Sequence, residues 1–294
     1  PGVEESRPTR ADVADCVSAP LDRLRQRGAE RLQRVGRLGG QDGLGGSGLG
    51  EADAGRGVGA YATTTGILAS MSDAAMPTRL VLVRHGVTAQ TGPLLSGRTP
   101  GIPLSEQGVA QAEAAAGRIA RLPVVAVYAS PIERTVQTAE RIAAPHRLPV
   151  VELPGVIEAD YGEWTGGAIA ELAKTPEWKV VQTAPSRARF PGGESIREMQ
   201  ARTVAALDEV IAAHPSRTVV VVGHADPIKS AVAHYTGLHL DLFQRLHVAP
   251  ASATVLDVSD HGVMLVKHND TGGLDDLVPA PPTGEGADGS EAQA

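Results

Sequence analysis

The chain has 294 residues, of which 42% are hydrophobic and 3% aromatic, and it carries a formal net charge of -7. The acidic balance argues against a general nucleic-acid binder, which needs a basic face, and a single cysteine excludes an internal disulfide framework. No apolar run approaches the roughly 18 residues that span a bilayer, and no uninterrupted apolar stretch marks a secretory signal. We therefore expect a cytoplasmic protein with an aliphatic core and no nucleic-acid or membrane partner.

Residues 1–76 differ in composition from the rest of the chain, because arginine and glycine dominate and Tyr61 is the only aromatic residue. Such a segment buries too little apolar surface to offset the entropy lost on ordering. The chain begins with Pro1, while Met71 and Met76 lie just before the first strand. We expect either a disordered extension or upstream sequence included by a misplaced start, without a catalytic role.

Residues 77–269 alternate between short apolar strands and helical patterns and are interpreted as one domain, followed by an acidic, disordered tail over 270–294. Strands are expected over 80–83, 124–128, 149–153 and 218–222, with a closing hairpin over 253–258 and 262–267. Helices are expected over 103–122, 131–144, 192–214 and from 227 to 235, the first capped by Ser105. This alternation predicts a three-layer α/β/α sandwich with a largely parallel central sheet.

Charged and imidazole side chains follow the carboxyl ends of the four expected parallel strands, where ligands of open α/β sheets bind. These are two arginines, two histidines and a carboxylate: Arg84, His85, Arg134, Glu158 and His224. Arginine forks match phosphate oxygens, and a neutral imidazole can attack phosphorus. A glutamate with a raised pKa can protonate a departing alkoxide, and here Asp160 and Glu163 are alternatives to Glu158. The set is suited to a phosphoryl group.

Five sequence blocks occur in the order found in the histidine phosphatase superfamily. They are LVRHG (82–86), SPIERTVQTA (130–139), EADYGEWTG (158–166), PGGES (191–195) and VVGHADPIK (221–229). Over about residues 78–268 the chain resembles the phosphoglycerate-mutase-like branch of this superfamily. It is similar to small actinobacterial members described as phosphomutases or phosphatases.

The resemblance implies a phosphoglycerate-mutase-like fold and a metal-independent phosphomonoesterase that needs no cofactor and acts on a small phosphorylated metabolite. His85 would be the nucleophile that becomes phosphorylated, and Glu158 would be the general acid and later the base. The phosphate pocket would be formed by Arg84, Arg134 and His224. Substrate contacts would come from Arg84, Gly86, Thr91, Ser96, Gly97, Arg134 and Ala225.

Two positions depart from the family pattern and leave the substrate open. Thr91 stands where the family often has asparagine, and Ser96 stands where a longer polar residue is common. The alternatives are a phosphomutase, which returns the phosphoryl group to substrate, and an inactive phospho-ligand-binding module. The short span from Arg134 to Gly192 favours the phosphatase, while the intact catalytic set speaks against the inactive module. A homodimer paired through an exposed sheet edge is a further expectation.

Overall fold

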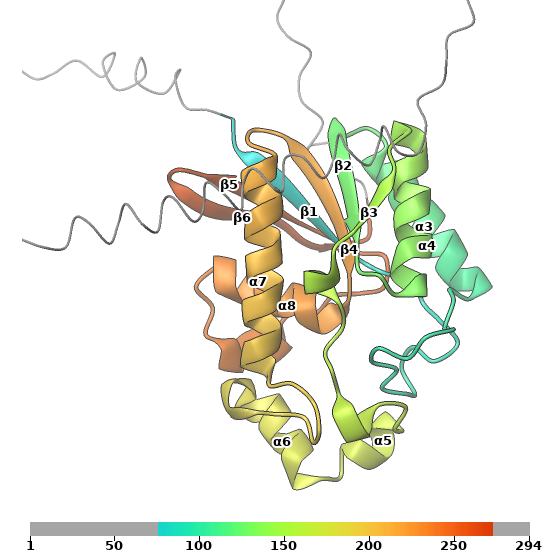
Figure 1. Ribbon diagram of the computed structural model, residues 1–294, viewed down its shortest axis with the longest axis vertical. Coiled ribbons are helices and arrows are strands. Elements are labelled where there is room, and N and C mark those ends of the chain that lie inside the picture. Colours follow the sequence, from blue (N-terminus) through green and yellow to red (C-terminus); the bar gives the residue numbers. More distant parts are fainter. Residues whose placement is uncertain (1–75, 273–294) are drawn as a thin grey trace, which may run out of the picture. The chain divides into compact units, whose positions relative to one another are not determined.

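The computed structural model describes residues 76–272, and this part of the chain contains a six-stranded sheet in the order β3-β2-β4-β1-β5-β6 (Figure 1). The strands are β1 (Thr78–Arg84), β2 (Val124–Ala129), β3 (Val150–Glu152), β4 (Thr218–Gly223), β5 (Ala253–Ser259) and β6 (Gly262–Asp270). Neighbours from β3 to β1 are parallel, whereas β5 and β6 add antiparallel pairs. The predicted α/β fold with a largely parallel sheet is confirmed.

The predicted domain limits fall largely where the structure gives no description. Residues 1–75 and 273–294 lie outside the described residues, so the expected extension and the rest of the expected tail stay predictions. Strand β6 ends at Asp270, beyond the predicted strand end at Lys267. Its last residues are held by Asn269, whose side-chain carbonyl oxygen accepts a hydrogen bond from the Ala249 amide over 2.6 Å.

Helices cover both faces of the sheet, with α3 and α4 on one face and α7 and α8 on the other (Figure 1). Their bounds are α3 (Glu106–Ile119), α4 (Glu133–Ala143), α7 (Ile196–Ala213) and α8 (Ala225–Tyr235). Because side chains alternate along a strand, Val81 and Val83 of β1 enter the α3/α4 core, and Leu80 and Leu82 enter the α7/α8 core. The sheet is therefore fixed by aliphatic packing on both sides.

Helix starts depend on local capping groups. Ser105 caps α3 as predicted, because its hydroxyl accepts a hydrogen bond from the Gly108 amide at 3.1 Å. The predicted start of the later helix at Gly192 is wrong, because Gly192 has a left-handed φ of 67°. Instead α7 begins at Ile196 after a capping box, in which Ser195 and Glu198 exchange side-chain and backbone hydrogen bonds.

A small helical lobe lies beyond the carboxyl ends of the parallel strands and was not predicted (Figure 1). It contains η3 (Gly162–Trp164), α5 (Ile169–Leu172), α6 (Pro176–Thr183) and η5 (Leu240–Arg245). Its core holds both tryptophans, both phenylalanines and one tyrosine, here named the aromatic cluster: Tyr161, Trp164, Trp178, Phe190 and Phe243. The sheet core, by contrast, is aliphatic except for the buried Tyr128 and the partly buried Tyr235. The few aromatic residues are thus concentrated on one side of the strand ends.

No helix within residues 76–272 is long and apolar enough to cross a membrane. Strand β6 forms one edge of the sheet, and its Met264 side chain is exposed. Pairing of two copies at this edge stays a prediction.

Candidate active site

The carboxyl ends of β1, β4 and β2 meet at one level of the sheet. Arg84 pairs in register with Gly223, and the His85 amide donates to the Gly223 carbonyl over 3.0 Å. The Ser130 amide donates to the Val222 carbonyl of β4, also over 3.0 Å. The residues that follow these three strands therefore lie close together, as expected for a ligand site of an open α/β sheet.

His85 is buried and held in one tautomer. Its Nδ1 lies 2.6 Å from the Gly86 carbonyl oxygen, which can only accept, so Nδ1 carries the proton and Nε2 keeps a lone pair. Arg134 donates from Nε to that Nε2 over 3.1 Å. Burial, and then the charge of Arg134, lower the pKa of His85 to about 3. The imidazole is therefore neutral at physiological pH, with its nucleophilic nitrogen beside a guanidinium group.

The backbone after His85 passes very close to α3 at Gly86. A side chain at this position would overlap the Gly108 carbonyl of α3, so only glycine allows the close approach of strand end and helix. The Gly86 amide donates to the Thr138 hydroxyl over 3.2 Å, and its carbonyl is taken by His85. The carbonyl thus orients the histidine ring, and the amide ties the strand end to α4.

Two arginines converge beside the histidines. Arg134 is only 3% exposed and donates from Nη2 to the Gly97 carbonyl over 2.8 Å. Arg84 donates from Nη1 to the Val248 carbonyl over 2.7 Å. Among the described residues, the buried Arg134 Nη1 and Arg84 Nε atoms have no hydrogen-bond acceptor. Anchored guanidinium groups with unused donors are suited to binding an anion such as phosphate.

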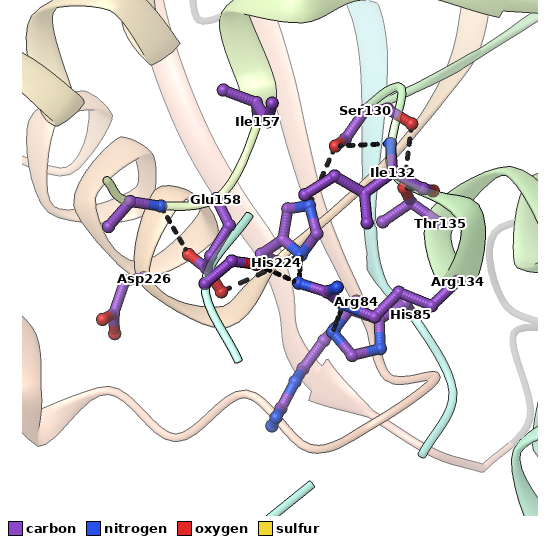
Figure 2. Close-up of polar contacts among 12 residues, drawn as sticks. Arg84, His85, Ser130, Ile132, Arg134, Thr135, Ile157, Glu158, His224 and Asp226 are labelled. Carbon is purple, nitrogen blue, oxygen red and sulfur yellow. Dashed lines mark hydrogen bonds and ion pairs between the residues drawn. The ribbon is translucent and has the colours of Figure 1, made fainter. Parts of the chain in front are cut away.

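His224 is fully buried between Ser130, Arg134 and Glu158 (Figure 2). Arg134 Nη2 lies 3.3 Å from Nδ1 and can only donate, so Nε2 carries the proton towards the Ser130 hydroxyl at 2.8 Å. Burial, followed by the neighbouring His85 and Arg134, holds the pKa of His224 well below its ordinary value. The two imidazole rings are 5.3 Å apart between centroids. His224 therefore enters the cluster as a second neutral imidazole.

Glu158 supplies the carboxyl group of the cluster. Its Oε1 accepts a hydrogen bond from the Ala159 amide at 2.9 Å, and its Oε2 lies 3.8 Å from His224 Nδ1. Burial, and then the charge of Asp226, raise the pKa of Glu158 to about 7. A carboxyl group with this pKa can both give and take a proton near neutral pH.

The alternative carboxylates have other surroundings. Asp160 accepts from the Gly162 amide at 3.1 Å and lies 3.6 Å from an Arg98 nitrogen, and Glu163 is exposed. Neither is among the residues that line the pocket next to the histidines. Of the three carboxylates considered, the fold thus brings Glu158 to the histidines.

A second group of charged residues holds the Glu158 backbone and was missed by sequence reasoning. Arg202 of α7 donates to the carbonyls of Ile157 and Glu158 over 2.8 and 3.1 Å. Arg98 donates to the same Glu158 carbonyl over 2.8 Å. Glu194 joins the two arginines, at 2.6 Å from Arg202 and 3.1 Å from Arg98. The segment carrying the carboxyl group is therefore fixed by two guanidinium groups.

A pocket of about 290 Å³ opens onto this cluster. Its lining includes most of the residues predicted for the site: Arg84, His85, Thr91, Ser96, Gly97, Arg134, Glu158 and Ala225. His224 is buried behind this lining, and Gly86 orients His85 instead of lining the pocket. Thr91 is turned towards Thr88, whose amide donates to its hydroxyl over 2.9 Å, and Ser96 donates to the Gln90 side chain over 3.0 Å.

Other residues that line the pocket were not predicted for the site: Tyr161, Trp178, Phe190, Asp226, Lys229 and Gln244. Asp226 and Lys229 follow His224 in the first two turns of α8 and pair at i,i+3, with 3.0 Å between Nζ and Oδ1. Because both residues lie in the sequence block around His224, their spacing could have indicated that they lie near the site. Trp178 and Gln244 come from α6 and η5, where no motif marked them.

Within residues 76–272, no group of three or more His, Cys, Asp or Glu side chains is placed to hold a metal ion.

A central α/β sheet with paired histidines and arginines at its carboxyl edge defines a phosphoglycerate-mutase-like protein. The chain belongs to the histidine phosphatase superfamily (branch 1), whose family model matches residues 80–271. It is a histidine-type phosphatase or phosphomutase, which confirms the resemblance seen in the sequence blocks.

Named relatives support this assignment. Phosphoserine phosphatase 1 of Hydrogenobacter thermophilus is 33% identical over 198 residues, covering 66% of this chain and 92% of the relative. A bifunctional protein of Mycobacterium tuberculosis is 36% identical over 203 residues, or 67% of this chain, which spans 55% of that longer protein. The structure of a mycobacterial glucosyl-3-phosphoglycerate phosphatase superposes with a TM-score of 0.60 at 26% identity, covering 65% of this chain and 98% of the other.

Replacing Arg202 by lysine is expected to lower kcat by about tenfold, because a single ammonium group cannot replace the planar fork that holds the Glu158 segment. Steady-state kinetics with an alkyl phosphate will measure the effect. Arg197→Lys is the matched control on the same helix, because Arg197 donates to the Ser186 carbonyl instead. An equal loss in both variants, or no loss in Arg202→Lys at an unchanged melting temperature, would contradict the positioning role.

Proposed function

We propose that this protein is a metal-independent phosphomonoesterase, which hydrolyses a small phosphorylated metabolite through a phosphohistidine on His85. The observation that carries the proposal is the buried, neutral His85, whose Nε2 lone pair faces Arg134 at 3.1 Å. The phosphatase names of relatives support the reaction class. A cytoplasmic location belongs to the same proposal.

In the first step the phosphoryl group binds against the guanidinium groups of Arg84 and Arg134, which both line the pocket beside His85. His85 Nε2 forms a bond to phosphorus while the ester P–O bond breaks. Glu158 gives its proton to the departing oxygen, and the Gly86 carbonyl holds the proton on Nδ1 as the ring gains positive charge. The products are the alcohol and a phosphorylated His85.

In the second step Glu158, now a carboxylate, takes a proton from a water molecule. The water oxygen attacks phosphorus and the P–Nε2 bond breaks, which releases inorganic phosphate and restores neutral His85. His224 lies beside Arg134 and 5.3 Å from the His85 ring, where its proton-bearing edge is fixed by Ser130. We assign it to holding Arg134 in place, so that the guanidinium group stabilises the phosphoryl oxygens as charge shifts between donor and acceptor.

The proposal is tested by trapping the intermediate during turnover of p-nitrophenyl phosphate in the presence of EDTA. We expect phosphate release, together with a protein-bound phosphoryl group that is labile in acid and stable in alkali, as expected for phosphohistidine. Product analysis on a panel of phosphorylated metabolites separates hydrolysis from isomerisation, the outcome that would favour the phosphomutase. Folded protein that turns over no phosphomonoester would contradict both enzymatic readings and favour the inactive module.

A further inference from the structure

One wall of the pocket is built from mutually packed aromatic rings. Tyr161, Trp178 and Phe190 of the aromatic cluster line the pocket. Phe190 contacts Tyr161 edge-on at 4.8 Å between centroids, and Trp164 packs behind both Phe190 and Trp178 at 5.7 and 5.9 Å. Such mutually packed rings present a rigid apolar surface, against which a further ring can pack favourably.

Aliphatic side chains extend this apolar surface around the pocket: Leu94, Leu95, Ile169 and Val181. They come from the loop after β1 and from α5 and α6, so three separate segments contribute. A pocket of about 290 Å³ with this lining is sized for a small molecule that has an apolar body as well as a phosphoryl group.

Four polar residues of the pocket lining are bonded to one another: Tyr161, Asp226, Lys229 and Gln244. Lys229 donates to Asp226 over 3.0 Å and to the Gln244 side-chain carbonyl over 2.9 Å. Tyr161 donates its hydroxyl to the other Asp226 oxygen over 3.1 Å. Although burial opposes ionisation, Lys229 holds the pKa of Asp226 below its ordinary value. The positive charge of Lys229 and the negative charge of Asp226 therefore neutralise each other.

The charges that remain uncompensated are at the phosphate end. Of the residues that line the pocket, the cationic ones are Arg84, Arg134 and Lys229, and Lys229 is neutralised by Asp226. A carboxylate on the leaving group would meet either the apolar wall or the Asp226 carboxylate, and would lose hydration without gaining a free cation. A zwitterionic group would first have to break the bonds that join Lys229, Asp226 and Tyr161.

We propose that the ester hydrolysed at this site has an uncharged leaving group with an apolar, ring-bearing body, which packs against Tyr161, Trp178 and Phe190. This inference rests on the proposed phosphatase function and narrows its substrate class. It sets the chain apart from a phosphatase whose substrate carries a carboxylate, such as phosphoserine, although one relative bears that name.

Three synthetic esters with similar leaving-group chemistry separate the contributions of ring and charge: ethyl phosphate, 2-phenylethyl phosphate and 2-(4-carboxyphenyl)ethyl phosphate. Phosphoserine serves as the zwitterionic comparison. We expect kcat/KM for the phenylethyl ester to exceed that for each of the other esters by about tenfold or more, as is typical of apolar pockets and unpaired buried charges.

Two variants test which residues cause the selectivity. Trp178→Ala should lower the phenylethyl-to-ethyl ratio of kcat/KM by about tenfold. Val180→Ala should keep it, because Val180 lies on the same helix with 40% of its surface exposed. Asp226→Asn leaves Lys229 uncompensated and should raise the carboxyphenyl-to-phenylethyl ratio. Asp226 also affects the pKa of Glu158, but this effect is the same for both esters and therefore drops out of the ratio of their kcat/KM values.

The outcomes distinguish this inference from the proposed function. Absence of turnover with all four esters, and of a phosphorylated protein, would overturn the phosphatase itself. Turnover with equal or higher kcat/KM for the carboxylated ester or phosphoserine would overturn the substrate class and leave the phosphatase standing. If Trp178→Ala does not fold, the kcat/KM ratios of the wild type and of Asp226→Asn still test the proposed substrate class.

Discussion

Replacing His85 by alanine is expected to lower kcat/KM for phosphomonoesters on the order of 10⁴-fold or more, because the covalent route is lost with the nucleophile. The neighbouring side chains cannot take over this role. Arg134 has no basic lone pair, and the Nδ1 of His224 faces Arg134 at 3.3 Å and Glu158 at 3.8 Å from behind the pocket lining. Release of p-nitrophenol in EDTA measures the loss.

The same variant should carry no acid-labile phosphoryl group after quenching during turnover. His261→Ala is the control, because His261 is exposed in the turn between β5 and β6. It should match the wild type in rate and in labelling. A His85→Ala protein that keeps activity within tenfold of the wild type, or still becomes labelled on histidine, would place the nucleophile elsewhere.

Replacing Glu158 by glutamine is expected to lower kcat/KM for alkyl phosphates by about 10²–10⁴-fold, because an amide cannot protonate the departing alkoxide. The loss should be much smaller for p-nitrophenyl phosphate, whose leaving group departs without a proton. Glu163→Gln, at an exposed position in the same segment, is the control. Equal losses on both kinds of ester would contradict a general-acid role.

The pH profile depends on the same carboxyl group. Because the pKa of Glu158 is raised to about 7, its protonated form is present below that pH and is lost above it. For alkyl phosphates kcat/KM should therefore fall as pH rises through about 7, and Glu158→Gln should lack this descending limb. A limb that persists in the variant would assign the proton donor to another group.

Stability should depend on the same titration. The pKa of Glu158 is about 7 in the folded protein and near 4.5 when unperturbed, so the folded state binds more protons between these values. The contribution of this group to stability is complete below about 4.5 and is lost as pH rises through 7. Denaturation midpoints measured across this window should fall more steeply for the wild type than for Glu158→Gln.

The sequence predicted a largely parallel sheet and the strand ends that carry the site, but not the order of the strands. Runs such as Leu80–Val83 are apolar on both faces and therefore predict buried parallel strands. In such a sheet, the residues after each carboxyl end must meet at one edge. His85 and His224 were placed by this local rule together with the family blocks, and the structure brings them to 5.3 Å between ring centroids.

The surroundings of those side chains come from contacts between distant parts of the chain. The choice of Glu158 over Asp160 and Glu163 depends on Arg98 and Arg202, which fix the segment from distant parts of the chain. The aromatic wall and the closed Asp226–Lys229 pair depend on how α6, η5 and α8 pack together beyond the sheet. Their packing is set by contacts between residues far apart in sequence, for which no periodicity or motif exists. Strand ends therefore predicted which side chains meet at the site, and long-range packing sets the pKa of Glu158 and the shape of the pocket beside it.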